Sequence, residues 1–192
     1  MPNRYRAQQA GLDSLTCVSS GRKQDWLDLF ADDAVIQDPV GVSPLDPTGL
    51  GHRGKRAIEA FWDAVMPNGI AGYEIHESFP SGDSCANVQT LITRLPDGTT
   101  ARTRCVAVYT VNDAGKVISL RAYWDYRKLE QQLQQLQLKR EERVDHGGTA
   151  VARVRIRIDS SVSVAGLVDM MKNIPTPPPT ETAPVDTATP TA

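Results

Sequence analysis

The hydrophobic period of this chain changes once, near residue 70, and this change constrains the fold more than any other feature. Before it, apolar residues recur at helical spacing; after it, apolar and polar residues alternate, with short turns rich in Gly, Pro and Asn between the segments. The helical segments are 4–20, 25–31 and 55–66, and the alternating segments are 71–79, 85–95, 99–111 and 117–125. Three helices followed by a meander of strands predict an α+β fold, with the helices packed against a curved antiparallel sheet.

Asp38 has an unusual position, between a short apolar strand and a proline. Val35 and Ile36 predict a buried strand, and Pro39 cannot continue it because proline has no N–H to donate. A carboxylate at the edge of an apolar enclosure is poorly solvated, which raises its pKa and makes it a better base. The spacing alone also fits a surface Asp in a turn before proline.

The composition predicts a cytoplasmic protein of one domain with an extension. The chain has 192 residues, 40% of them hydrophobic, and its net charge of −2 argues against binding to nucleic acid. Cys17, Cys85 and Cys105 are odd in number and lie in predicted helix and strands, which indicates reduced, buried thiols. No apolar run reaches the length of a membrane span, and we expect no signal peptide because residues 1–9 are polar.

The C-terminal third predicts an extension, 127–172, and a tail, 173–192. The extension contains a polar helix at 127–144, an alternating strand at 151–158 and a small apolar segment at 162–171. The tail holds six Pro and six Thr and no aromatic residue. Such a segment buries too little apolar area to offset its ordering entropy, so we expect it to be disordered.

Neither a cofactor nor a metal site is predicted. Gly49, Gly51 and Gly54 match the dinucleotide pattern G-x-G-x-x-G, but a Pro-rich loop precedes them where that pattern needs a buried strand. The three histidines are scattered without the paired spacing of metal ligands, and the cysteines form no CxxC pair.

Three stretches resemble the ketosteroid isomerase branch of the NTF2-like superfamily. They are Trp-Leu-Asp-Leu-Phe-Ala-Asp-Asp-Ala-Val-Ile-Gln-Asp-Pro-Val-Gly at 26–41, Ala-Ile-Glu-Ala-Phe-Trp at 57–62, and Asn-Asp-Ala-Gly-Lys-Val-Ile-Ser-Leu-Arg-Ala-Tyr-Trp at 112–124. The likeness covers roughly residues 10–126 and is greatest to an actinobacterial, mycobacterial-type subgroup. It implies a conical NTF2-like domain at 1–126, a homodimer formed through the outer sheet face, and a small hydrophobic, steroid-like ligand.

The resemblance also implies a chemistry for Asp38. Ketosteroid isomerases move a carbon–carbon double bond into conjugation with a ketone; one Asp takes the proton alpha to the carbonyl and returns it further along the dienolate. Asp38 aligns with that base. The oxyanion donors of the family do not carry over, because Ser14 stands at the position of its tyrosine, Ala107 at that of its protonated Asp, and Trp62 at that of a third tyrosine.

Strand alternation identifies further candidates for a ligand pocket around Asp38. It places alternate residues of 103–111 on one face, next to the matching residues of 120–124. The candidate ligand-binding residues are Ser14, Trp62, Cys105, Ala107, Tyr109, Leu120 and Trp124. Four of them could donate a hydrogen bond to a ligand oxygen: Ser14, Trp62, Tyr109 and Trp124. Ordinary core packing is the alternative for the three aromatic residues.

Three functions fit this sequence. The first is an isomerase in which Asp38 moves a proton on a steroid-like or polycyclic ketone. The second is a non-catalytic binding protein for steroid-like or other hydrophobic ligands, because the oxyanion pair is absent. The third is an epoxide hydrolase or polyketide cyclase on the same scaffold, with Asp46 or Glu59 as a second carboxylate. Glu59 is expected on the solvent face of its helix, opposite Phe61 and Trp62.

Overall fold

The computed structural model describes residues 5–66, 69–95 and 98–145. The predicted strand at 151–158, the apolar segment at 162–171 and the tail at 173–192 lie outside these residues. Four helices and six strands are present in the described part of the chain. The helices are α1 (Arg6–Ser19), α2 (Lys23–Asp28), α3 (Lys55–Val65) and α4 (Tyr126–Asp145). The strands are β1 (Phe30–Gln37), β2 (His52–Arg53), β3 (Ile70–Ser81), β4 (Ser84–Arg94), β5 (Thr100–Val111) and β6 (Val117–Tyr123).

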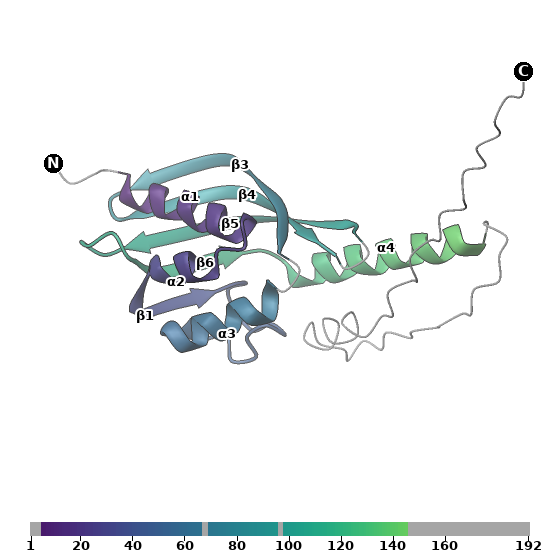
Figure 1. Ribbon diagram of the computed structural model, residues 1–192, viewed down its shortest axis with the longest axis horizontal. Helices are drawn as coiled ribbons and strands as arrows, with labels where there is room; N and C mark the ends of the chain where they lie inside the picture. The colour runs from purple at the N-terminus through teal and green to yellow at the C-terminus, as the bar shows by residue number, and fades with distance from the viewer. Residues whose placement is uncertain (1–4, 67–68, 96–97, 146–192) are drawn as a thin grey trace, which may run out of the picture.

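All six strands form one curved sheet in the order β2-β1-β6-β5-β4-β3 (Figure 1). Neighbouring strands are antiparallel, as predicted, except that β1 and β6 run parallel. Strands β3 to β6 follow one another through short turns, which explains why the sequence pattern located them within a few residues. The α+β fold expected from the change in hydrophobic period is therefore confirmed.

The predictions around residue 30 were partly wrong. The second helix was expected to reach residue 31, but α2 ends at Asp28, and β1 begins at Phe30, several residues before the predicted strand. Phe30 is 1% exposed and pairs with Val117 of β6, a contact far away in the sequence. That contact overrides the local helical period. The two-residue strand β2 was not predicted.

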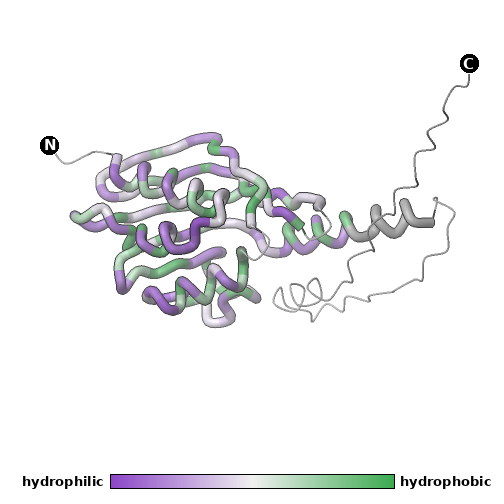
Figure 2. The backbone as a smooth tube through the Cα atoms, viewed as in Figure 1, coloured by the Kyte–Doolittle hydropathy of each residue, from purple (hydrophilic) through white to green (hydrophobic). Residues whose placement is uncertain are grey.

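Helices α1, α2 and α3 cover one face of the sheet, which we call the inner face. α1 packs against β3, β4 and β5, whereas α3 packs against β1 and β2. Between them lies an aromatic cluster in which the ring of Trp26 is 4.6 Å from that of Phe30 and 5.0 Å from that of Trp62. Hydrophilic residues are interleaved with hydrophobic ones along the strands (Figure 2), as expected for a sheet with one buried face.

Helix α4 covers an edge that the sheet leaves open. β6 ends at Tyr123, opposite Val106, so no strand of the described residues lies beside the first residues of β5 there. The side-chain amide of Gln132 accepts a hydrogen bond from the backbone N–H of Arg102 and donates one to its carbonyl oxygen at 3.3 Å. The side chain thus replaces a missing strand, and α4 extends from this end of the sheet (Figure 1). Among the helices that the structure describes, none has the length and hydropathy of a membrane span.

Candidate active site

The strand register brings the predicted site residues together in rows across the inner face. Tyr109 of β5 pairs with Leu120 of β6 in the first row, and Ala107 pairs with Ala122 in the second. Trp124 follows directly after Tyr123, which pairs with Val106, and therefore lies beside Cys105. On the other side of β5, the strand β4 contributes Cys85, Asn87 and Gln89 to the three rows.

Asp38 lies at the end of the second row. It follows Gln37, which pairs with Arg121 of β6, and two residues later the N–H of Val40 donates to the carbonyl oxygen of Ala122 at 2.8 Å. Since side chains alternate between faces, Asp38 lies on the inner face, beside Ala122. Pro39 ends the strand here, as the sequence predicted.

The Asp38 carboxyl is enclosed and holds a single side-chain hydrogen bond in the described residues, from the indole Nε1 of Trp124. Burial raises its pKa to about 6, although the hydrogen bond from Trp124 opposes the rise. The residue as a whole is half-buried, because it lies where the strand leaves the sheet. A carboxylate with a pKa near neutrality is suited to take up a proton and release it again.

Ser14 and Tyr109 form a hydrogen-bonded pair deeper in the interior. The Oγ of Ser14 accepts a hydrogen bond from the Trp26 indole at 2.9 Å and another from the Tyr109 hydroxyl at 3.3 Å. Burial raises the pKa of Tyr109, and the charge of Asp38 raises it further, whereas the bond to Ser14 lowers it. Tyr109 therefore remains a protonated hydrogen-bond donor at neutral pH.

Cys105 and Ala107 lie between these groups. Burial raises the pKa of the Cys105 thiol to about 12, the nearby Asp38 charge adds to the rise, and a hydrogen bond from Gln89 opposes it. Such a thiol is not a nucleophile at neutral pH. Ala107 is 2% exposed and offers only a methyl group.

Trp62 and Leu120 belong to the hydrophobic core. Both are buried in the main apolar cluster, and Trp62 packs against Trp26 as described above. For Trp62, core packing is the alternative given above for the aromatic residues, and it is a sufficient reason for its presence; Leu120 likewise packs in the core.

Two buried amides on β4 were missed in the sequence analysis. Asn87 is 1% exposed and Gln89 is 2% exposed, and both face the inner side. The Nδ2 atom of Asn87 and the Oε1 atom of Gln89 have no hydrogen-bond partner among the described residues. The alternation Cys-Ala-Asn-Val-Gln at 85–89 contained the signal, since it places both amides on the same face as Cys85.

The two candidates for a second carboxylate are engaged elsewhere. Burial acts to raise the pKa of the Asp46 carboxyl, but hydrogen bonds from Thr48 and from the backbone N–H of Gly51 together lower it. These bonds also organise the loop before β2. Glu59 forms an ion pair with Lys23 at 3.0 Å, and half of its side chain is exposed. Glu59 therefore lies on the solvent side of α3, as expected.

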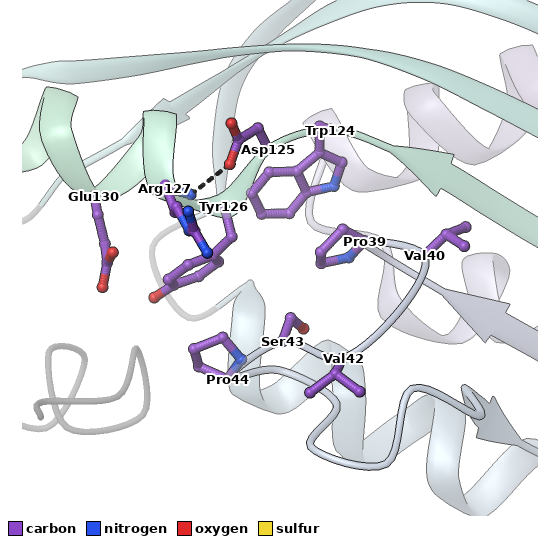
Figure 3. Close-up of a pocket in the computed structure, with 10 residues that line it drawn as sticks. All are labelled: Pro39, Val40, Val42, Ser43, Pro44, Trp124, Asp125, Tyr126, Arg127 and Glu130. Atoms are coloured by element: carbon purple, nitrogen blue, oxygen red, sulfur yellow. Dashed lines mark hydrogen bonds between the residues drawn. The ribbon is translucent and has the colours of Figure 1, made fainter.

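A cavity of about 360 Å³ lies next to this site, between the loop after β1 and the first turn of α4 (Figure 3). Pro39, Pro44, Trp124 and Tyr126 line part of it. Trp124 is shared, because its indole N–H holds Asp38 while its ring forms a wall of the cavity. Within the described residues, no group of three or more His, Cys, Asp or Glu side chains is arranged to hold a metal ion.

Comparison with known proteins identifies the family. A model of the SnoaL-like domain matches residues 12–120, which is more than half of the chain. This protein belongs to the SnoaL-like domain family. The SnoaL-like fold is the NTF2-like cone expected from the sequence resemblance. No protein of curated function matches the chain.

Several solved structures are similar to this SnoaL-like protein. A Δ5-3-ketosteroid isomerase from Mycobacterium sp. is 39% identical, with a TM-score of 0.59 over 62% of this chain and 93% of that one. A Mycobacterium tuberculosis protein, solved in complex with estradiol-17β-hemisuccinate, is 36% identical, with a TM-score of 0.59 over 64% of this chain and 95% of that one. A computationally designed 17-OHP binder is 34% identical, with a TM-score of 0.60 over 64% of this chain and 95% of that one.

Proposed function

We propose that this protein is a ketosteroid isomerase-like enzyme that acts on a steroid-like or polycyclic ketone. Asp38 is the general base, which takes the proton alpha to the carbonyl and returns it further along the conjugated system. Protons move within one molecule, so the reaction needs no cofactor.

The observation that carries this proposal is the environment of Asp38. Its carboxyl lies on the inner face, beside Ala122 and close enough to Cys105 and Tyr109 to raise both of their pKa values. Burial raises its own pKa to about 6, so it is ionised at neutral pH and still basic enough to accept a proton from carbon. The similarity to a ketosteroid isomerase at 39% identity supports the same assignment.

A non-catalytic binding protein is the second candidate, and Ala107 favours it. Each oxyanion donor contributes about 10²–10³ in rate, so a site without the family's acid and tyrosine would be a slow catalyst unless other donors replace them. Similar structures include a protein solved with a steroid ester and a designed binder, which supports a flat, apolar ligand under either function. An epoxide hydrolase or cyclase is less well supported, because Asp46 and Glu59 are engaged away from Asp38.

Two measurements on the unmodified protein test the proposal. Incubation with a β,γ-unsaturated 3-keto-steroid should produce the conjugated ketone, whose formation is monitored by ultraviolet absorbance. Estradiol should bind in an equilibrium titration. Binding without turnover would leave the binding protein as the function. Absence of both would show that the site serves another class of ligand.

We further propose that the molecule is a homodimer formed through the outer face of the sheet. Val106 and Tyr123 are paired across β5 and β6 on this face and are 36% and 43% exposed, and Phe79 of β3 is 55% exposed. Val88 of β4 pairs with Val106 and continues the apolar surface. Apolar side chains that gather on an uncovered sheet face are typical of a protein interface.

A further inference from the structure

Among the described residues, the nitrogen of the buried Asn87 amide lacks a partner, and hydrogen bonds to its carbonyl oxygen orient the side chain. Its Oδ1 accepts a hydrogen bond from the Oγ of Ser78 at 2.7 Å, and that Oγ accepts one from the Nε2 of Gln8 at 2.9 Å. The Gln8 amide nitrogen can only donate, which leaves the Ser78 proton for Asn87, and the Cys85 thiol donates to the same Asn87 oxygen at 3.4 Å. The carbonyl oxygen of Asn87 therefore faces Ser78, and its Nδ2 is left without an acceptor.

The position of Asn87 in the sheet is directly opposite Ala107. The two residues pair across β4 and β5, in the row that continues through Ala122 to Asp38. Side chains paired in this way have Cβ atoms about 4.5–5.5 Å apart. Ala107 stands where the related isomerases are expected to have their protonated acid, so the unpaired amide is the nearest donor on the adjacent strand.

The groups around Asn87 have more donors than acceptors. A methyl group added to Gly11 of α1 would lie 2.9 Å from the Asn87 Nδ2 and 3.2 Å from the Tyr109 ring, so these two side chains meet at the same point of the helix. Ser14 lies one turn further along α1, and its single oxygen already accepts from Trp26 and, at 3.3 Å, from Tyr109. The latter bond is longer than the usual 2.7–2.8 Å between hydroxyl groups, so the Tyr109 donor is weakly held. Among the described residues, no acceptor next to these donors is free, and the unpaired Oε1 of Gln89 lies one row away.

We propose that Asn87 is a catalytic residue that takes the place of the missing acid, with Tyr109 as the second donor. Resting on the proposed isomerase function, the step transfers a proton from the alpha carbon to the Asp38 carboxylate. The electron pair of that C–H bond forms the enolate double bond, and the negative charge develops on the former carbonyl oxygen. The Asn87 N–H and the Tyr109 O–H donate to this oxygen and keep their protons. Since protein atoms enclose the amide nitrogen in the free protein, ligand entry must separate it from its neighbours by about the width of an oxygen atom.

Asn87→Leu tests this assignment, because leucine has a similar size and no donor. Thr90→Val is the matched control: Thr90 is a buried polar residue of the same strand, but it lies on the outer face, where its hydroxyl forms a hydrogen bond with His76 at 2.8 Å. Two readouts are measured for each variant: kcat and KM with the β,γ-unsaturated keto-steroid, and the pKa of bound 2-naphthol from its absorbance.

We expect Asn87→Leu to lower kcat about 10²-fold or more with little change in KM, and to raise the pKa of the bound naphthol. Thr90→Val should change neither readout, and adding Ala107→Asp to Asn87→Leu should restore part of kcat. Unchanged kcat and naphthol pKa in Asn87→Leu, or equal changes in Thr90→Val, would overturn the assignment.

The two readouts also separate this inference from the proposed function. If the protein binds naphthol but turns over no steroid, the isomerase function fails, and the naphthol pKa still decides whether Asn87 donates to a ligand oxygen. If the protein neither turns over the steroid nor binds naphthol, both fail.

Discussion

At the scale of single residues, the raised pKa of Asp38 links the site to the stability of the fold. Burial raises the pKa of its carboxyl from 3.8 to about 6, so the folded state holds a proton that the unfolded state releases between these values. The stability that the Asp38 proton contributes to the folded state is fully present below about pH 4, and it is lost as the pH rises through about 6. One pKa unit corresponds to 1.36 kcal/mol, so the loss is of the order of 3 kcal/mol at most.

Asp38→Asn should remove this pH dependence. We expect the free energy of unfolding of the unmodified protein, relative to that of the variant, to fall by about 2–3 kcal/mol between pH 4 and pH 7. Urea denaturation at several pH values measures it. Parallel curves for the two proteins would mean that Asp38 is not desolvated.

A second residue-scale prediction concerns Ala107. Ala107→Asp places a carboxyl among buried, largely apolar neighbours, where its neutral form is favoured and can donate to the enolate oxygen. We expect steroid turnover to rise by about 10²-fold if the proposed function is correct. Ala107→Val, which adds bulk without a donor, is the control, and an equal or greater rate in that variant would contradict the explanation.

At the scale of elements, the Gln132 side chain attaches α4 to the open edge of β5. Gln132→Leu removes both hydrogen bonds to Arg102, and we expect it to lower the free energy of unfolding by about 1 kcal/mol and to speed hydrogen exchange of the Arg102 amide. Gln131→Leu is the control, because Gln131 is exposed. Unchanged exchange at Arg102 in Gln132→Leu would show that α4 does not protect this edge.

The elements differ in how well the sequence predicts them. Strands β3 to β6 each carry an alternating pattern and pair with their neighbours in the chain, so local information sufficed. β1 pairs with β6 across some 85 residues. Its first residues have a helical pattern in the sequence, and only the pairing of Phe30 with Val117 makes them a strand. The edge contact of Gln132 depends on where β6 stops, which no local pattern determines.

At the scale of the whole molecule, the outer sheet face makes assembly testable. Val106→Glu places a charge at the centre of the apolar surface, next to its copy in a symmetric dimer, and should convert the dimer to monomer. Sedimentation velocity across the micromolar range measures the mass. Val42→Glu is the control, since Val42 is 78% exposed but lies in the loop after β1. A monomeric unmodified protein, or equal dissociation in both variants, would contradict the proposed interface.

The site was predictable only in part. Pro39 marked Asp38 as the end of its strand, but only the family resemblance singled it out as a base, since the spacing also fits a surface turn. Strand alternation correctly grouped Cys105, Ala107 and Tyr109 on one face. The unpaired nitrogen of Asn87 could not be predicted, because it depends on distances between side chains of different strands and of α1. The cytoplasmic location and the disordered tail stay predictions.

The most direct measurement of the central claim is the rate of double-bond transposition as a function of pH in the unmodified protein, in Asp38→Asn and in Asp33→Asn. Asp33 lies on the same strand and is exposed, which makes it a matched control. We predict that kcat/KM rises with pH through about 6 and then levels off, as the base ionises, in the unmodified protein and in Asp33→Asn. Asp38→Asn should show no turnover while it still binds estradiol. Turnover that survives in Asp38→Asn would contradict the role of Asp38 as the base.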